Sequence, residues 1–347
     1  MTKQAETTIH DIAKKLNISA STVSRALNNN PLISKPTRML IERTAKEMGY
    51  RPNIMAANFR TRKTKTIGVI VPLINRHFFS SVISGIEDVA YNLGYAVTIS
   101  QSNDNYEKET KIAHTLFSNR VDGLIISIGM GTTHFEHLRL FPDRNIPLVF
   151  FDRVVDGIQA HKIVVDDFHG GFIATEHMIE HGGRRIAHIG GPLNLKIYRD
   201  RLEGYKDALQ RDGLPADESR IVHNSLTRTD GTNAIKKLLE NRQRPDAIFC
   251  ANDTTALSVI LYLREKRIKV PDDMMVVGFS NEPFSEVVTP SISTVRQPGF
   301  EMGQKAADLL IRQIKTQDKP THYQTIVMPT GLIVRESSVR KTSGKRE

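Results

Sequence analysis

From Thr66 onward, the sequence alternates short apolar runs rich in β-branched residues with segments whose apolar residues recur at helical spacing. The first runs are IGVIVP (67–72), YAVTIS (95–100), GLIISI (123–128) and PLVFF (147–151). This alternation is typical of parallel strands joined by crossover helices. Because the rhythm restarts near residue 163 with IVVD, the sequence predicts two α/β lobes in series. A ligand is expected outside the carboxyl ends of the strands, where the lobes face each other.

The first 65 residues differ from the rest of the chain in charge. They contain 13 Lys or Arg against 4 Asp or Glu, whereas residues 66–334 contain 30 against 32. A basic head on a nearly neutral body is the charge distribution of a polyanion-binding module attached to a second functional unit. The alternative is a solvated, charged pair of helices, so the charge needs a supporting motif.

The head has the pattern of three short helices. Thr8, Ser19 and Ser34 are suitable N-caps, and the residues that follow each of them have helical periodicity. A very short turn separates the first two helices. This arrangement predicts a helix-turn-helix.

The second helix, predicted over Ala20 to Leu27, has a small, polar and basic side. At about 100° per residue, Ala20, Ser21, Ser24 and Arg25 lie together on it. Small side chains let a helix enter the major groove, and an arginine can bind guanine O6 and N7 with two hydrogen bonds. Arg25 is therefore the chief candidate for reading a base. The alternative is an ordinary exposed helix face.

Missing features exclude several classes of protein. No stretch approaches the roughly 18 uninterrupted apolar residues of a membrane span, so we expect no membrane partner. The first twenty residues lack the apolar core of a secretion signal, which predicts a cytoplasmic location. The single cysteine, Cys250, cannot form an intramolecular disulfide or a Cys-rich zinc site, and its flanks indicate a buried strand end.

Two short motifs could suggest enzymatic chemistry. His177, Glu180 and His181 spell HxxEH, the pattern of an inverted zinc-protease site, but the glycines after His181 place it in a last helical turn. Gly129 and Gly131 follow a predicted strand without the third glycine of a dinucleotide site or the lysine of a phosphate loop. We therefore expect no enzyme and no cofactor, with a zinc hydrolase as a remote alternative.

The segments ASTVSRALN, YRPN and KTIGVIVP, with the residues between them, resemble the head of the LacI/GalR family of transcriptional regulators. The order of elements matches that family across essentially the whole chain. The resemblance implies a helix-turn-helix DNA-binding domain (1–52), a hinge helix and linker (53–65), and an effector-binding and dimerisation domain (66–347). The last is expected to resemble periplasmic binding proteins, with an N-lobe over about 66–163 and 296–325 and a C-lobe over about 164–295 and 326–340.

The resemblance assigns residues to DNA. Ala20, Ser21 and Arg25 fall where relatives touch bases, and a hinge helix over residues 53–60 would enter the minor groove. Phe59 occupies the wedge position, where most relatives carry leucine; phenylalanine can also unstack a base step. The alternative for Phe59 is a linker residue packed on the body. The expected DNA-binding residues are Thr8, Ser19, Ala20, Ser21, Thr22, Ser24, Arg25, Asn28, Ser34, Arg51, Asn53, Ala56 and Phe59.

The resemblance also assigns residues to the effector. It places Arg199 where an arginine reaches the ligand, and makes Arg201 a neighbour or salt-bridge partner. Asp152 and Asp166 end strands, where an aspartate binds ligand hydroxyls or caps a helix. Ser280 replaces the aspartate usual in sugar-binding relatives, which favours an anionic ligand paired with Arg199. The expected effector residues are Asn75, Phe78, Phe79, Asp152, Asp166, Arg199, Asn252, Asp253, Ser280 and Gln297.

The predicted function is a ligand-controlled transcription regulator, specifically a repressor. It would bind a pseudo-palindromic operator as a homodimer, under control of a sugar, sugar phosphate or similar small molecule. The tail after Arg335 lacks an apolar heptad, so a dimer of dimers is not expected. The alternatives are control by a protein co-regulator, a sugar-capture protein of the transport type, and the zinc hydrolase.

Overall fold

The computed structural model describes residues 7–50, 63–316, 320 and 322–340. The chain divides into two compact units, Met1–Thr64 and Lys65–Glu347. They correspond to the basic head and the α/β body. In the described part of the chain, no helix combines the length and apolar character that crossing a bilayer requires.

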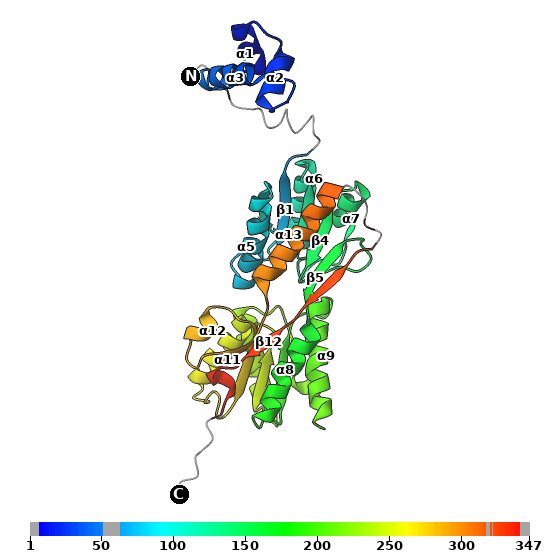
Figure 1. Ribbon diagram of the computed structural model, residues 1–347. Helices are drawn as coiled ribbons and strands as arrows, with labels where there is room; N and C mark the ends of the chain where they lie inside the picture. The colour runs from blue at the N-terminus through cyan, green and yellow to red at the C-terminus, as the bar shows by residue number, and fades with distance from the viewer. Residues whose placement is uncertain (1–6, 51–62, 317–319, 321, 341–347) are drawn as a thin grey trace. The chain divides into compact units, whose positions relative to one another are not determined.

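The described part of the N-terminal unit consists of α1 (Ile9–Leu16), α2 (Ala20–Leu27) and α3 (Lys35–Glu47), shown in blue in Figure 1. Thr8, Ser19 and Ser34 cap them as predicted. Asn17 adopts a left-handed conformation and ends α1, so that α2 can begin three residues later. Buried apolar residues from all three helices form the small core: Ile12, Ala13, Val23, Ala26, Ile41 and Ala45.

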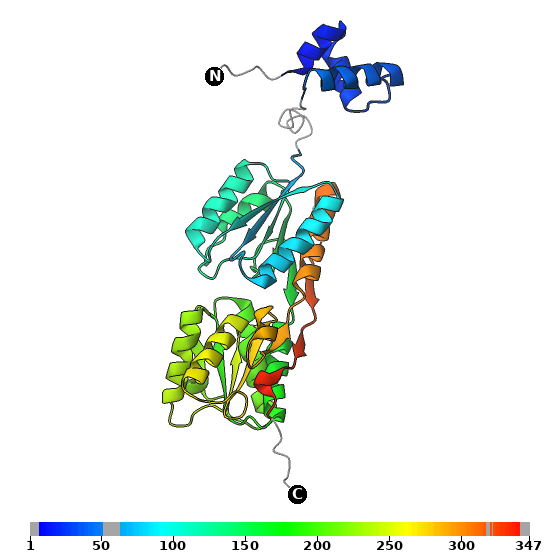
Figure 2. The ribbon, with the colours of Figure 1, turned by 90° about the vertical axis from the view of Figure 1, so that its left-hand side faces the viewer.

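The body contains two six-stranded sheets, and each forms one lobe. The sheet of the first lobe has the order β11-β5-β4-β3-β1-β2, and its strands pair in parallel. Its buried strands alternate between two apolar clusters, so helices cover both faces, as Figure 2 shows. The α5 and α13 helices cover one face, and α6 and α7 cover the other. The strands are β1 (Thr66–Val71), β2 (Ala96–Gln101), β3 (Gly123–Ile126), β4 (Leu148–Phe151), β5 (His161–Val165) and β11 (Thr325–Met328), and the helices are α5 (His77–Asn92), α6 (Tyr106–Ser118), α7 (Glu136–Asp143) and α13 (Gly299–Thr316).

The sheet of the second lobe has the order β12-β10-β9-β8-β6-β7. Only the β10–β12 pair is antiparallel within this sheet. The α8 and α9 helices pack on one face, and α10 and α11 pack on the other. The strands are β6 (Ile186–Gly190), β7 (Ile221–His223), β8 (Ala247–Cys250), β9 (Met275–Ser280), β10 (Ser293–Arg296) and β12 (Gly331–Ile333), and the helices are α8 (Asp167–Glu180), α9 (Lys196–Arg211), α10 (Arg228–Glu240), α11 (Asp253–Glu265) and α12 (Phe284–Val287), with short 3-10 turns at Glu218–Arg220 and Glu336–Ser338.

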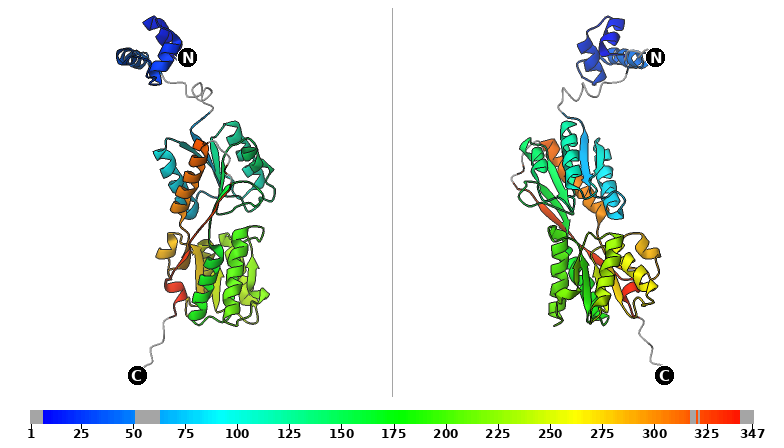
Figure 3. Two further views of the ribbon diagram at one scale, coloured as in Figure 1. Left: turned by 45° about the vertical axis from the view of Figure 1, so that its right-hand side comes forward. Right: turned by 180° about the vertical axis from the view of Figure 1, so that it is seen from behind.

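The chain passes between the lobes after β5, after β10 and after β11, and Figure 3 shows the last crossing in red. The lobe boundaries predicted at residues 163, 295 and 325 each fall inside one of these strands. The IVVD strand was expected to open the second lobe, but β5 completes the first sheet by pairing with β4 and β11. A strand belongs to the sheet with which its backbone forms hydrogen bonds, and the residues of the strand itself do not show which neighbours these are.

In each lobe, two helices approach so closely that only glycine fits at the contact. A Cβ at Gly204 of α9 would lie 2.0 Å from the carbonyl oxygen of Phe168, and one at Gly171 of α8 would lie 2.2 Å from that of Arg201. Gly85 of α5 and Gly303 of α13 form the equivalent contact in the first lobe. These contacts fix α9 against α8, and α9 carries side chains into the space between the lobes.

Candidate DNA-reading helix and ligand cavity

The α2 helix has a buried side and a solvent-exposed side. Val23 and Ala26 are buried in the small core, whereas Ser21 and Arg25 are exposed. The exposed side therefore has one long basic side chain beside small polar ones, the combination suited to the major groove. The other predicted contacts in this unit are exposed or half-buried: Thr8, Ser19, Ala20, Thr22, Ser24, Asn28 and Ser34.

Some of these side chains also stabilise helices. The Ser19 hydroxyl accepts a hydrogen bond from the Thr22 amide at 3.1 Å, and the Asn28 amide group donates to the Ser24 carbonyl at 2.7 Å. The predicted hinge helix, over residues 53–60, lies outside the described residues. The same holds for four predicted contacts: Arg51, Asn53, Ala56 and Phe59.

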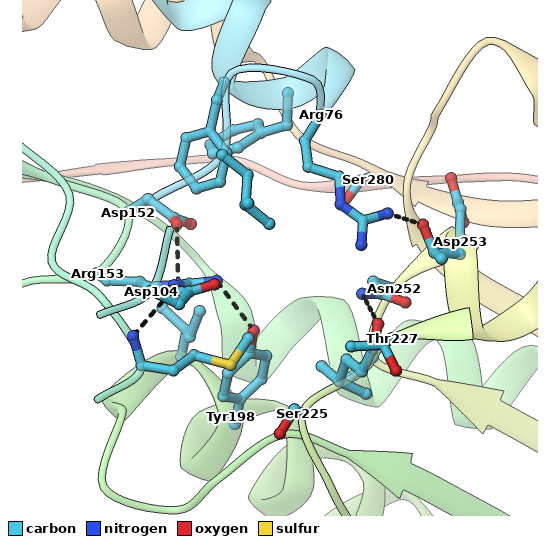
Figure 4. Close-up of a pocket in the computed structure, with 18 of the residues that line it drawn as sticks. Arg76, Asp104, Asp152, Arg153, Tyr198, Ser225, Thr227, Asn252, Asp253 and Ser280 are labelled. Carbon is cyan, nitrogen blue, oxygen red and sulfur yellow. Dashed lines mark hydrogen bonds and ion pairs between the residues drawn. The ribbon is translucent and has the colours of Figure 1, made fainter. Parts of the chain in front are cut away.

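A cavity of about 590 Å³ lies between the two lobes, at the carboxyl ends of their strands (Figure 4). Both lobes contribute to its wall, as the strand order predicts. Seven of the ten predicted effector residues line it: Phe78, Phe79, Asp152, Asn252, Asp253, Ser280 and Gln297.

Arg199 was expected to reach the ligand, but the structure places it outside the cavity. Its exposed guanidinium donates to the carbonyls of Leu193 and Asn194, at 2.7 and 3.1 Å. Arg201 lines the cavity instead. Two residues along an α-helix correspond to a rotation of about 200°, so only one of these two arginines can face inward.

Asn75 and Asp166 also lie outside the cavity. Asn75 is exposed before α5, and the next residue, Arg76, lines the wall instead. Asp166 caps α8 by accepting the His169 amide hydrogen at 2.9 Å, which is the alternative that the sequence left open. At the first position the next loop residue faces the cavity, and at the second the predicted residue itself binds the helix end.

The two most buried arginines of the cavity are neutralised by carboxylates. The Arg201 guanidinium binds Asp167 at 2.8 Å, donates to the Ala251 carbonyl at 2.7 Å and lies 3.6 Å from the centre of the Phe279 ring. Arg153 forms an ion pair with Asp104. Sequence reasoning missed Asp104 and Arg153 as wall residues, although each lies just beyond the carboxyl end of a strand.

Burial raises the pKa of two cavity carboxyl groups. The pKa of Asp253 is raised to about 6, while Asp253 accepts hydrogen bonds from the Thr294 hydroxyl at 2.6 Å and the Glu282 amide at 2.7 Å. The pKa of Asp152 is also raised by burial, against the opposing influence of Arg153, whose Nε lies 3.9 Å away. The Asp253 carboxylate therefore already accepts hydrogen bonds from the protein. The Asp152 carboxylate can still accept hydrogen bonds from a ligand in the cavity.

Two buried donors in the cavity wall lie near the Asp152 carboxylate but make no hydrogen bond of normal length within the described structure. They are Nε of Arg153 and Nε2 of Gln297. The side-chain oxygen of Gln297 accepts a hydrogen bond from the Ser280 hydroxyl at 2.9 Å. Only its amide nitrogen is then left without a hydrogen bond of normal length. Buried N–H groups are nearly always hydrogen-bonded, so this pair indicates where ligand oxygens would bind.

The HxxEH motif does not form a metal site in the described structure. Nε2 of His177 contacts the Ser338 hydroxyl at 2.7 Å, and Glu180 is exposed. The described residues contain no group of three His, Cys, Asp or Glu side chains placed to hold a metal ion. The motif is instead the last turn of α8, attached to the C-terminal segment.

Comparison with known proteins agrees with this architecture. The model of bacterial regulatory proteins of the lacI family matches residues 8–53, and that of the periplasmic binding protein-like domain matches residues 175–338. Catabolite control protein A of Priestia megaterium is 34% identical over 334 residues, which are 95% of this chain and 99% of that protein. The repressor CytR of Escherichia coli K12 is 33% identical over 318 residues, 91% of this chain and 92% of that protein.

Solved structures extend the comparison to three dimensions. The lac repressor dimer bound to operator and the anti-inducer ONPF matches with a TM-score of 0.84 at 25% identity, over 97% of this chain and 100% of that one. The complex of the regulator CelR with cellobiose matches with a TM-score of 0.73 at 28% identity, over 96% of this chain and 100% of that one. The chain therefore belongs to the LacI family of DNA-binding transcriptional repressors, which carry a periplasmic-binding-protein-like effector domain and are not enzymes.

Proposed function

We propose that this repressor responds to a neutral, polyhydroxylated molecule of the sugar class, bound in the cavity between the lobes. The observation that carries the proposal is a pair of buried donors, Arg153 Nε and Gln297 Nε2, which lie near the Asp152 carboxylate but make no hydrogen bond of normal length to the described protein. A sugar hydroxyl is both donor and acceptor, so it can accept from the two N–H groups and donate to the carboxylate. Phe78 and Phe79 supply an apolar wall for the ring.

The positions of the arginines favour a neutral ligand over a phosphorylated one. Arg199, the residue expected to pair with an anionic ligand, lies outside the cavity. Asp167 neutralises Arg201, and Asp104 neutralises Arg153. Among the three described arginines that line the cavity, Arg76 is then the one best able to bind an anionic group of a ligand. Its guanidinium donates a hydrogen bond to the Thr254 hydroxyl.

On the DNA side, we propose a homodimer in which two α2 helices read the half-sites of a pseudo-palindromic operator. Arg25 would read a base, and the paired Phe59 side chains would act as minor-groove wedges between the half-sites. Support comes from the exposed face of α2 and from the lac repressor, which was solved as a dimer on its operator. Sedimentation of the full chain should give twice the monomer mass, 78 kDa from the 39.0 kDa chain.

The proposed ligand class is tested by a thermal-shift screen of the full chain against sugars, sugar phosphates, nucleobases and small acids. A ligand that binds the folded state raises the melting temperature by mass action. We expect a neutral sugar to give the largest shift, with Asp152→Asn removing it and Arg199→Gln, at the surface, leaving it intact. A response limited to sugar phosphates would contradict the proposal, and no response across the panel would favour a protein co-regulator.

A further inference from the structure

The loop after β3 forms one wall of the cavity. We call residues Gly129 to Thr132 the 129–132 wall; Met130 and Gly131 line the cavity directly. A Cβ at Gly129 would lie 3.1 Å from the Asp104 backbone, and one at Gly131 would lie 3.0 Å from the Asp104 carbonyl oxygen. The two glycines thus let this wall lie tightly against the loop that carries Asp104, which is the structural reason for the Gly-Met-Gly motif.

Behind this wall, away from the cavity, lies a carboxylate with no exposure to solvent. Glu109 of α6 is 0% exposed and accepts three hydrogen bonds. The Gly129 amide donates to it at 2.7 Å, the Thr132 hydroxyl donates at 3.0 Å, and Nε2 of His137 lies 3.0 Å away. Two of the three donors belong to the 129–132 wall.

The cavity side of the same wall makes the contacts that shape the ligand space. The Met130 amide donates to Asp104 at 2.8 Å, and Asp104 in turn holds Arg153. The Met130 carbonyl accepts a hydrogen bond at 3.0 Å from Asn194, which belongs to the second lobe. One loop therefore connects Glu109 both to a cavity arginine and to the contact between the lobes.

We infer that Glu109 is a positioning residue of the effector site, which fixes the 129–132 wall and, through it, Asp104, Arg153 and the Asn194 contact between the lobes. A buried carboxylate is costly unless it is fully hydrogen-bonded, and among described residues the ion-pair partner of Glu109 is His137 alone. An apolar residue would fill this space at lower cost but could not accept hydrogen bonds from the wall. The inference rests on the proposed function, in that it takes the cavity as the ligand site.

The test is hydrogen–deuterium exchange of the full chain without any ligand, comparing wild type with Glu109→Gln. One carboxylate oxygen of Glu109 accepts from both Thr132 and His137, and the other accepts from the Gly129 amide. The Gln side chain keeps only one acceptor oxygen, so its NH2 group must face a donor on one of these two sides and the wall should loosen. We expect exchange in peptides covering 128–133 and 192–196 to become roughly tenfold faster, while peptides from β6 and β8 stay unchanged. Glu107→Gln, which removes an exposed charge from the same helix, is the matched control and should change neither.

A second variant and a spectroscopic signal keep the inference falsifiable. Thr132→Val removes one donor without touching the buried charge, and it should loosen the 128–133 peptide even if Glu109→Gln does not fold. The ¹⁵N signal of the His137 ring, assigned from its absence in His137→Gln, should shift in Glu109→Gln and not in Glu107→Gln. Unchanged exchange at 128–133, or equal acceleration of every peptide, would overturn the inference. Because no ligand is used, a failed sugar screen would leave this result intact.

Discussion

Two arginines of α9, separated by one residue, have opposite environments. Arg201 is 3% exposed and bound to Asp167, whereas Arg199 is exposed and bound to loop carbonyls. We expect Arg201→Gln to lower the free energy of unfolding of the body by about 3–5 kcal/mol, because it leaves a buried carboxylate without its partner. Arg199→Gln should change it by less than about 0.5 kcal/mol. Urea unfolding of both variants checks this, and equal losses would contradict the assignment.

Arg25 is the residue whose loss should alter DNA sequence preference. Sites would first be selected by the wild-type chain from a random library. On a selected site, Arg25→Ala should cost about 1–3 kcal/mol and relax one base position in each half-site. Arg43→Ala removes the same charge from α3, where Arg43 pairs with Glu47, and should leave the preference unchanged. If Arg25→Ala weakened binding equally on selected and random DNA, Arg25 would contact only phosphates.

His188 should make the stability of the second lobe sensitive to acid. Burial between Tyr205 and Phe249 lowers the pKa of His188 to about 3, from about 6.5 in the unfolded chain. Between these values only the unfolded state binds the proton, so stability falls as the pH falls, by up to about 1.4 kcal/mol per unit. His188→Phe should remove this component from a series of urea unfolding curves between pH 7 and pH 4. His114→Phe, at an exposed position, should keep the wild-type slope.

For helices and strands, the sequence predicted where each element lies better than it predicted which elements pack or pair with each other. The α2 helix was predicted with its observed bounds, because a cap and a period are both local signals. The IVVD strand was predicted but assigned to the wrong lobe. It pairs with β4, the strand directly before it, and with β11, which is distant in sequence, and its own residues do not show either pairing. The cavity was predicted at the strand ends. Arg199 was assigned to it by resemblance alone, whereas the packing of α9 on α8 determines that Arg201 is the arginine that faces the cavity.

The sequence pattern also did not show that α8 and α9 pack closely through glycine residues. A Cβ at Gly204 would meet the Phe168 carbonyl oxygen of α8, which belongs to a rigid backbone. We expect Gly204→Ala to separate α8 from α9 and to destabilise the body by about 1–3 kcal/mol. Gly331→Ala, where no atom lies within 4 Å of the added Cβ, should be neutral within about 0.5 kcal/mol. Thermal unfolding of the two variants distinguishes a packing effect from a general effect of replacing glycine.

In the whole molecule, the excess positive charge and the ligand cavity belong to different units. The basic residues of the head supply attraction to any DNA, and the nearly neutral body has a cavity with converging polar groups. Regulation then requires a coupling free energy between two sites that share no residue. Such a coupling is reciprocal: if the ligand changes operator affinity by some factor, the operator changes ligand affinity by the same factor.

This reciprocity gives a prediction for the full chain. With the sugar found by thermal shift and a selected operator, titration calorimetry in both orders should return equal factors, typically about 5- to 150-fold. A fragment of residues 65–347, which contains the compact second unit, should bind the sugar with an affinity that operator DNA does not change. Unequal factors for the full chain would mean that a third equilibrium is linked, such as dimer dissociation. A DNA-dependent affinity of the fragment would place part of the DNA surface on the body, contrary to the charge distribution.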